Sequence, residues 1–148
     1  MRLATLFFAS LCIALSAAAA RADETCQSPY LPKITGQEDY VYVWTLGVEG
    51  VGDGSDKLVT LGVNPAKPTY GKVVASLSVG GRHEAHHGGF TDDRRHLWMG
   101  GLDDSVIYVF DVASDPGRPK LVKTIDDFVA KSGGVVGPHT FYALPGRL

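Results

Sequence analysis

Apolar and β-branched residues occur along the chain in short runs, each followed by turn-forming residues. Runs of this kind, bounded by Gly, Pro, Asn and Asp, are typical of β-strands. The runs that we predict to be strands are residues 40–46, 57–63, 72–79, 96–99, 106–112, 121–125 and 139–144. No stretch has a helical period of useful length, and only residues 125–131 are predicted to form a short turn of helix. The pattern therefore predicts an all-β protein.

Two hairpin-like segments repeat along the chain. Residues 60–63 (TLGV) are followed by a proline-containing loop and then by residues 72–74 (KVV). Residues 109–112 (VFDV) are followed by a similar loop and then by residues 120–122 (KLV), so the offsets are 49 and 48 residues. A period of about 50 residues in an all-β chain favours β-propeller blades of four strands each. A sandwich with two similar hairpins is the alternative.

The length of the chain bounds the number of blades. Propellers close their ring with 4–8 blades, whereas the chain after residue 22 has room for only about two and a half at this period. We therefore expect an incomplete β-propeller of about two to three blades, a fragment of a longer protein.

The N-terminal segment has the pattern of a secretory signal peptide. Arg2 gives a basic start, residues 3–20 are uncharged and almost entirely apolar, and Ala20-Arg21-Ala22 fits a cleavage site between small residues. An uncleaved anchor helix is the alternative, but no stop-transfer pattern follows. We predict a signal peptide at residues 1–22 and a partial propeller domain at residues 23–148 of an exported protein.

Cleavage changes both the charge and the cysteine count. Arg2 and Arg21 leave with the signal peptide, which contains no acid, so the net charge falls from −2 to −4. A mildly acidic chain has no basic surface for nucleic acid. Cys12 also leaves, so Cys26 has no partner for an intramolecular disulfide. Its role as a reactive thiol, an intermolecular partner or a buried residue stays open.

Four of the five histidines lie between residues 83 and 96. Neutral imidazole is a preferred ligand of copper and zinc, and such sites combine several imidazoles. His86 and His87 are adjacent, and neighbours on a regular strand point to opposite faces. We therefore expect a turn, supplied by Gly88-Gly89, to bring both rings to one metal ion. The alternative is that these histidines are only polar surface residues of a loop.

His139 strengthens the metal hypothesis because it lies 52 residues after His87, close to the repeat period. Equivalent positions in successive blades both approach the axis of a propeller, where several blades can each donate a ligand. We therefore predict that His86, His87 and His139 are metal ligands. His96 follows four charged residues that are typical of a solvated turn, and we do not include it.

Other catalytic motifs do not occur in the sequence. It contains no GxSxG elbow, no P-loop and no GxGxxG after a strand. The aspartate pairs at residues 92–93, 103–104 and 126–127 lie in predicted turns, where Asp is favoured for its hydrogen bonds to the backbone. We assign them no calcium-binding or acid–base role.

Three stretches together resemble the selenium-binding protein family. They are EAHHGGFTDD (residues 84–93), SVIYVFDVASDPGRPKLVKTI (residues 105–125) and GPHTFYALPGR (residues 137–147). KLVTLGVNPAKPTYGKV (residues 57–73) is also similar to blade segments of the family. The resemblance covers nearly all of the chain after the signal peptide but only the N-terminal third or so of a full member. It implies the N-terminal part of a seven-bladed β-propeller.

For the bacterial branch, the resemblance implies an exported, periplasmic, copper-dependent enzyme. Such an enzyme oxidises methanethiol with dioxygen and water to formaldehyde, hydrogen sulfide and hydrogen peroxide. His86, His87 and His139 match histidines of the family by position, which implies that they bind copper. Glu84 matches an acidic residue before the histidine pair and is expected to orient a ligand through a hydrogen bond. His83 is a weaker candidate, since animal members have an acidic residue there.

The chain departs from the family pattern in two respects. Animal members have cysteines just after the histidine pair, whereas residues 91–94 here are TDDR, so selenium binding through thiols is not expected at this place. The later blades, with further histidines, are also missing, so we expect this fragment to be inactive on its own. The alternative function is a propeller module that binds metal or selenium without turnover.

Overall fold

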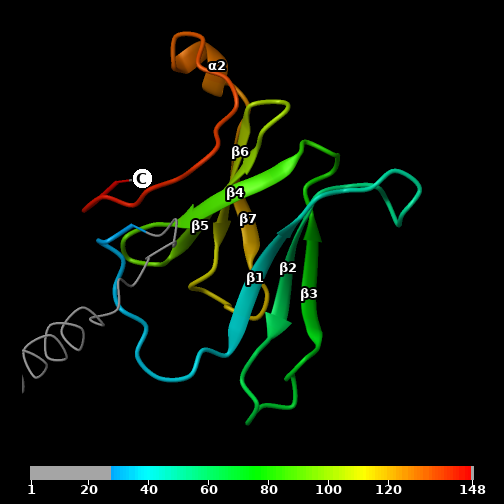
Figure 1. Cartoon of the computed structure of the whole chain (residues 1–148), viewed down its shortest axis with the longest axis vertical. Helices are drawn as coiled ribbons and strands as arrows, with labels where there is room; N and C mark the ends of the chain where they lie inside the picture. The colour runs from blue at the N-terminus through cyan, green and yellow to red at the C-terminus, as the bar shows by residue number, and fades with distance from the viewer. Residues whose placement is uncertain (1–27, 148) are drawn as a thin grey trace, which may run out of the picture.

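A computed structural model describes residues 28–147, and the predicted signal peptide and Cys26 lie outside this range (Figure 1). Its strands form two antiparallel sheets in which strands consecutive in sequence are neighbours, with the orders β1-β2-β3 and β4-β5-β6-β7. The elements are β1 (Tyr40–Thr45), β2 (Lys57–Gly62), β3 (Val73–Ser78), β4 (Ala85–Phe90), β5 (His96–Gly101), β6 (Val106–Asp111), β7 (Lys120–Ile125) and the short helix α2 (Phe128–Lys131). The predicted all-β class is confirmed. Within residues 28–147, no helix has the length and apolar character needed to cross a membrane.

Six of the predicted strands and the predicted helical turn are present, and two expectations about strands are wrong. Residues 85–90 form β4 although we predicted a turn at Gly88-Gly89, because pairing with β5 outweighs the low strand propensity of glycine. Residues 139–144 were expected to be a strand, but residues 139–143 lie outside both sheets, and Leu144 forms only an isolated antiparallel bridge with Arg147.

The internal repeat appears as the same irregularity in both sheets. The pairing of β2 with β3 shifts between Thr60 and Leu61, and the pairing of β6 with β7 shifts between Val109 and Phe110, 49 residues later. Such bulges add one residue to a strand and increase its twist. Strands β1–β3 thus correspond to β5–β7, and the two sheets repeat one unit as the blades of a propeller do. This agrees with the expected partial propeller.

The hydrophobic core lies between the two sheets. Its buried members are Leu58, Leu97, Met99, Val106, Tyr108, Phe110 and Val112. Trp44 of β1 joins the sheets, since its ring centroid lies 5.7 Å from that of Tyr108 and 5.9 Å from that of Phe110. The indole N–H of Trp44 also donates to the carbonyl oxygen of Gly100 at 3.0 Å. Large aromatic side chains in such contacts contribute strongly to packing, so β1 is fixed against the second sheet.

The fully buried side chain of Asp56 fixes the segment that leads into β4. One carboxylate oxygen accepts the N–H of Gly47 at 2.7 Å, and the other accepts the N–H of His83 at 2.9 Å. The backbone N–H of Asp56 donates to the carbonyl oxygen of Gly81 at 2.8 Å. Asp56 therefore connects the start of β2 with the start of the histidine-bearing strand.

We expect the Asp56→Asn variant to lose about 1–3 kcal/mol of unfolding free energy, because the amide nitrogen cannot accept a hydrogen bond and leaves a buried N–H unpaired. Urea unfolding measures this loss. The matched control is Asp53→Asn, since Asp53 is an exposed partner of Lys57 and exposed ion pairs contribute little. Equal losses in the two variants would contradict the role given to Asp56.

Candidate metal centre

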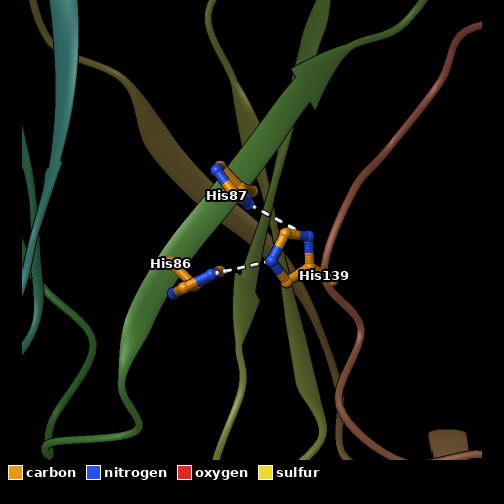
Figure 2. Close-up of side chains that lie close together, drawn as sticks. All are labelled: His86, His87 and His139. Atoms are coloured by element: carbon orange, nitrogen blue, oxygen red, sulfur yellow. Dashed lines mark hydrogen bonds between the residues drawn. The ribbon is translucent and has the colours of Figure 1, made fainter. Parts of the chain in front are cut away.

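The structure brings together the three histidines that the sequence singled out (Figure 2). His86 and His87 come from β4, whereas His139 comes from the segment without regular secondary structure that follows α2. The Nε2 atoms of His86 and His139 are 2.9 Å apart, and the Nδ1 atoms of His87 and His139 are 3.2 Å apart. One ring nitrogen from each histidine lies within 4.8 Å of the other two. These distances let one small cation contact all three imidazoles.

A bulge in β4 allows the two adjacent histidines to approach the same partner. Between Ala85 and Gly88, β4 advances three residues while β5 advances only two, so His86 and His87 share one position of the sheet. The bulge suspends the normal alternation of side chains between the two faces. The expectation of a turn at Gly88-Gly89 is therefore wrong, because both glycines are paired strand residues.

Two glycines let the segment that carries His139 lie directly on the second sheet. A Cβ atom on Gly89 would lie 2.5 Å from the carbonyl oxygen of Phe141, and one on Gly100 would lie 2.7 Å from the carbonyl oxygen of Pro138. Both distances are below any normal contact, so a larger residue would push the segment away. Because glycine has no Cβ atom, Gly89 and Gly100 let the backbone of the His139 segment approach the sheet closely. This explains why glycines occur within these strands.

We expect Gly100→Ala to destabilise the fold by about 1–3 kcal/mol through overpacking and to weaken metal binding by displacing His139. The control is Gly117→Ala, whose Cβ would meet the hydroxyl of Tyr40 at 3.1 Å, the end of a side chain that can move. Urea unfolding of both variants measures the difference. A Gly100→Ala protein as stable as the wild type would show that the segment does not need this close approach.

Three hydrogen bonds from residues distant in sequence hold the segment around His139. The pairs are Gly137 N–H to Ser105 Oγ at 2.9 Å, Ser28 Oγ to the carbonyl oxygen of Ala143, and Gly146 N–H to Asp92 Oδ2 at 2.7 Å. Sequence reasoning did not find Ser28, Ser105 or Asp92 as parts of the site. No motif marks the two serines, and Asp92 was assigned only to a turn.

The contacts of His139 are divided between its two ring nitrogens. Its Nε2 faces His86, whereas its Nδ1 faces His87 and also lies 2.9 Å from the hydroxyl oxygen of Thr140. Either nitrogen of His139 therefore lies next to a ring nitrogen of another histidine. His86 and His139 are exposed and His87 is half-buried, so the site is open to small molecules from solvent.

The residues just before the histidine pair make contacts outside the trio. A hydrogen bond with Asp103 raises the pKa of Glu84, and the described residues contain no hydrogen bond between Glu84 and the three histidines. The expected orienting role of Glu84 stays a prediction. His83 lies outside the trio, with its Nδ1 2.6 Å from Asp104 Oδ2, and His96 opens β5.

The donor set consists of three imidazoles and no carboxylate. Imidazole suits copper, zinc, iron and nickel, and sites with three protein ligands leave a coordination position for a substrate. The residues present therefore fit a copper ion, and they fit a zinc ion equally well.

Comparisons with known proteins agree on one family. The chain is 69% identical to a methanethiol oxidase of Ruegeria pomeroyi over 86% of its own length, and 65% identical to a methanethiol oxidase of Hyphomicrobium over the same share. It is 33% identical to selenium-binding protein 2 of Arabidopsis thaliana over 73% of its length. The chain spans only 29% of the length of the two bacterial relatives and 25% of the plant one.

A solved structure and a family profile extend this result. The fold is similar to that of a hypothetical selenium-binding protein from Sulfolobus tokodaii, with a TM-score of 0.57 and 30% identity over 62% of this chain and 23% of that one. The profile of the 56kDa selenium binding protein family (SBP56) matches residues 20–147. The chain therefore belongs to the 56kDa selenium-binding protein family.

Proposed function

We propose that His86, His87 and His139 bind copper in a protein that oxidises methanethiol. The convergence of three imidazole nitrogens, one from each histidine, within 4.8 Å of one another carries the metal part of this proposal. The names of the two bacterial relatives, at 69% and 65% identity, support the methanethiol part. Since the chain spans 29% of those relatives, it contributes part of the machinery.

The reaction converts methanethiol, dioxygen and water to formaldehyde, hydrogen sulfide and hydrogen peroxide. The carbon–sulfur bond and one carbon–hydrogen bond break, and carbon gains a double bond to the oxygen that comes from water. The two electrons lost by carbon, with two protons, reduce dioxygen to hydrogen peroxide, and the sulfur leaves as hydrogen sulfide. Bound copper would supply a soft centre for thiolate sulfur and a route for electrons to dioxygen. The three histidines of this chain would hold the ion through neutral imidazole nitrogens.

The proposal is tested by exchanging the matching segment of the Ruegeria pomeroyi enzyme for this chain. The copper-loaded chimera is expected to release sulfide and peroxide in equal amounts when methanethiol is added, and His87→Ala is expected to abolish the release. Unchanged turnover in the His87→Ala chimera would contradict the proposal.

The second candidate is a module that binds metal or selenium without turnover. The selenium-binding proteins of Arabidopsis thaliana, at 33% and 34% identity, favour it by their names. A folded chimera that retains copper and releases neither product would favour this second function.

We further propose that residues 1–22 direct export to the periplasm. The protein recovered from a periplasmic fraction is then expected to begin at Asp23, which mass spectrometry of the intact chain measures. Replacing Ala20 and Ala22 with leucine should block processing, since cleavage requires small residues at these positions. Recovered protein that still begins at Met1 would contradict export by cleavage.

A further inference from the structure

We infer that Ser105 is a positioning residue for the histidine site, an inference that rests on the proposed metal binding. Ser105 lies in the turn between β5 and β6 and is only 5% exposed. Its hydroxyl oxygen accepts the backbone N–H of Gly137 at 2.9 Å. Gly137 precedes His139 by two residues, so this hydrogen bond fixes the backbone just before the ligand.

The backbone conformation of Ser105 indicates that its hydroxyl is required. Ser105 has a φ of +54°, a left-handed conformation that glycine adopts without strain and that other residues rarely adopt. Glu84 and Arg94 also have positive φ, but Ser105 is the buried one of these three non-glycine residues. A serine at a buried position where glycine is favoured is explained by the hydrogen bond that glycine could not make.

The turn that contains Ser105 also holds the strand that carries the other two histidines. The N–H of Leu102 donates to the carbonyl oxygen of Glu84 at 3.1 Å, and the N–H of Asp103 donates to that of His83 at 3.3 Å. The turn therefore forms hydrogen bonds with the residues before β4 through its backbone, and with the His139 segment through the hydroxyl of Ser105. Residues 102–105 thereby set the distance between β4, which carries His86 and His87, and the segment that carries His139.

The histidine site depends on that distance. Between the histidines, the shortest distance from a ring nitrogen of His139 is 2.9 Å, to Nε2 of His86. Among residues 28–147, the segment around His139 belongs to neither sheet, and of the three hydrogen bonds that hold it, that of Ser105 is attached closest to His139 in sequence. Partners that orient metal ligands typically change metal affinity by about 10–100-fold when they are replaced. Loss of the Ser105 hydroxyl should therefore be measurable as weaker metal binding.

Two substitutions distinguish the effect of the Ser105 hydroxyl from the effect of backbone strain in the turn. Ser105→Ala removes the hydroxyl and keeps the strained backbone, whereas Ser105→Gly removes the hydroxyl and relieves the strain. We expect both variants of the 148-residue chain to bind copper about tenfold more weakly than the wild type in a titration against a chelator. Ser105→Gly is expected to melt at a higher temperature than Ser105→Ala, so that affinity and stability change separately.

A measurement without metal provides a second readout. The rings of His86 and His139 have centroids 4.5 Å apart, so nuclear Overhauser effects between their protons are expected in the metal-free wild type and should weaken in both Ser105 variants. The control is Ser78→Ala, because Ser78 also accepts a glycine N–H, that of Gly80 at 3.2 Å, but lies in the other sheet. It should change neither the ring contacts nor the copper affinity.

Three results would overturn the inference. Wild-type ring contacts in Ser105→Ala would show that the hydroxyl does not position His139. If the Overhauser effects between His86 and His139 stay at wild-type strength in Ser105→Gly but weaken in Ser105→Ala, strain in the turn and not the lost hydroxyl explains the change. If the wild type shows no such effects, the two rings do not lie together. A wild-type chain that shows the contacts but binds no copper would refute the proposed function, while the ring contacts would still decide the role of Ser105.

Discussion

Replacing His87 with alanine is expected to lower copper affinity by more than about 100-fold, the upper range for residues that only support a ligand. His87 is the half-buried member of the trio, and its Nδ1 lies 3.2 Å from that of His139. Its loss leaves two exposed imidazoles on separate chain segments. Competition with a copper chelator of known affinity measures the change.

His96→Ala is the matched control for this prediction. His96 opens β5 and lies outside the trio, so its replacement should leave copper affinity unchanged. Equal losses in the two variants, or wild-type affinity in His87→Ala, would show that copper binds elsewhere or without a defined site.

Replacing Phe110 with alanine is expected to cost about 3–5 kcal/mol of unfolding free energy. Phe110 is fully buried in β6, and its ring packs against Trp44 of the first sheet. Truncation would therefore leave a cavity at the junction of the two sheets. The midpoint and slope of urea unfolding measure the loss.

Leu121→Ala is the control for the core prediction. Leu121 pairs with Phe110 in the register of β6 and β7 but is 36% exposed. Its truncation removes less buried surface and leaves no closed cavity, so a much smaller loss is expected. Similar losses in the two variants would contradict the placement of the core between the sheets.

The strands could be predicted where short apolar runs are bounded by turn-forming residues. β2 alternates between half-buried and buried residues along its whole length, but its sequence, KLVTLG, was identified as a run of apolar residues and not by alternation of polar and apolar side chains. The bulge pairs of the two sheets, 49 residues apart, also agree with the repeat found in the sequence. Local side-chain chemistry determines both features.

β4 could not be predicted because its stability comes from its neighbour. His86, His87, Gly88 and Gly89 have no strong preference for a strand, and pairing with β5 supplies the missing stabilisation. The bulge that brings the histidines together is a property of this pairing. The sequence indicated that Gly88-Gly89 is needed next to the histidines. It could not show whether these glycines form a turn or allow the His139 segment to lie close to the sheet.

The candidate ligands could be predicted, whereas the residues that hold them could not. His86, His87 and His139 were found from residue type and from the repeat. Ser28 and Ser105 contact the His139 segment through hydrogen bonds that span 115 and 32 residues. Such contacts exist only in the folded chain, and a single serine is too common to mark them.

The claim that three histidines bind one copper ion is tested most directly by electron paramagnetic resonance of the copper(II)-loaded chain, purified without a histidine tag. We predict one copper ion per chain and hyperfine coupling to three imidazole nitrogens, with one nitrogen lost in each of His86→Ala, His87→Ala and His139→Ala. A chain that binds no copper, or a spectrum that these substitutions leave unchanged, would contradict the claim.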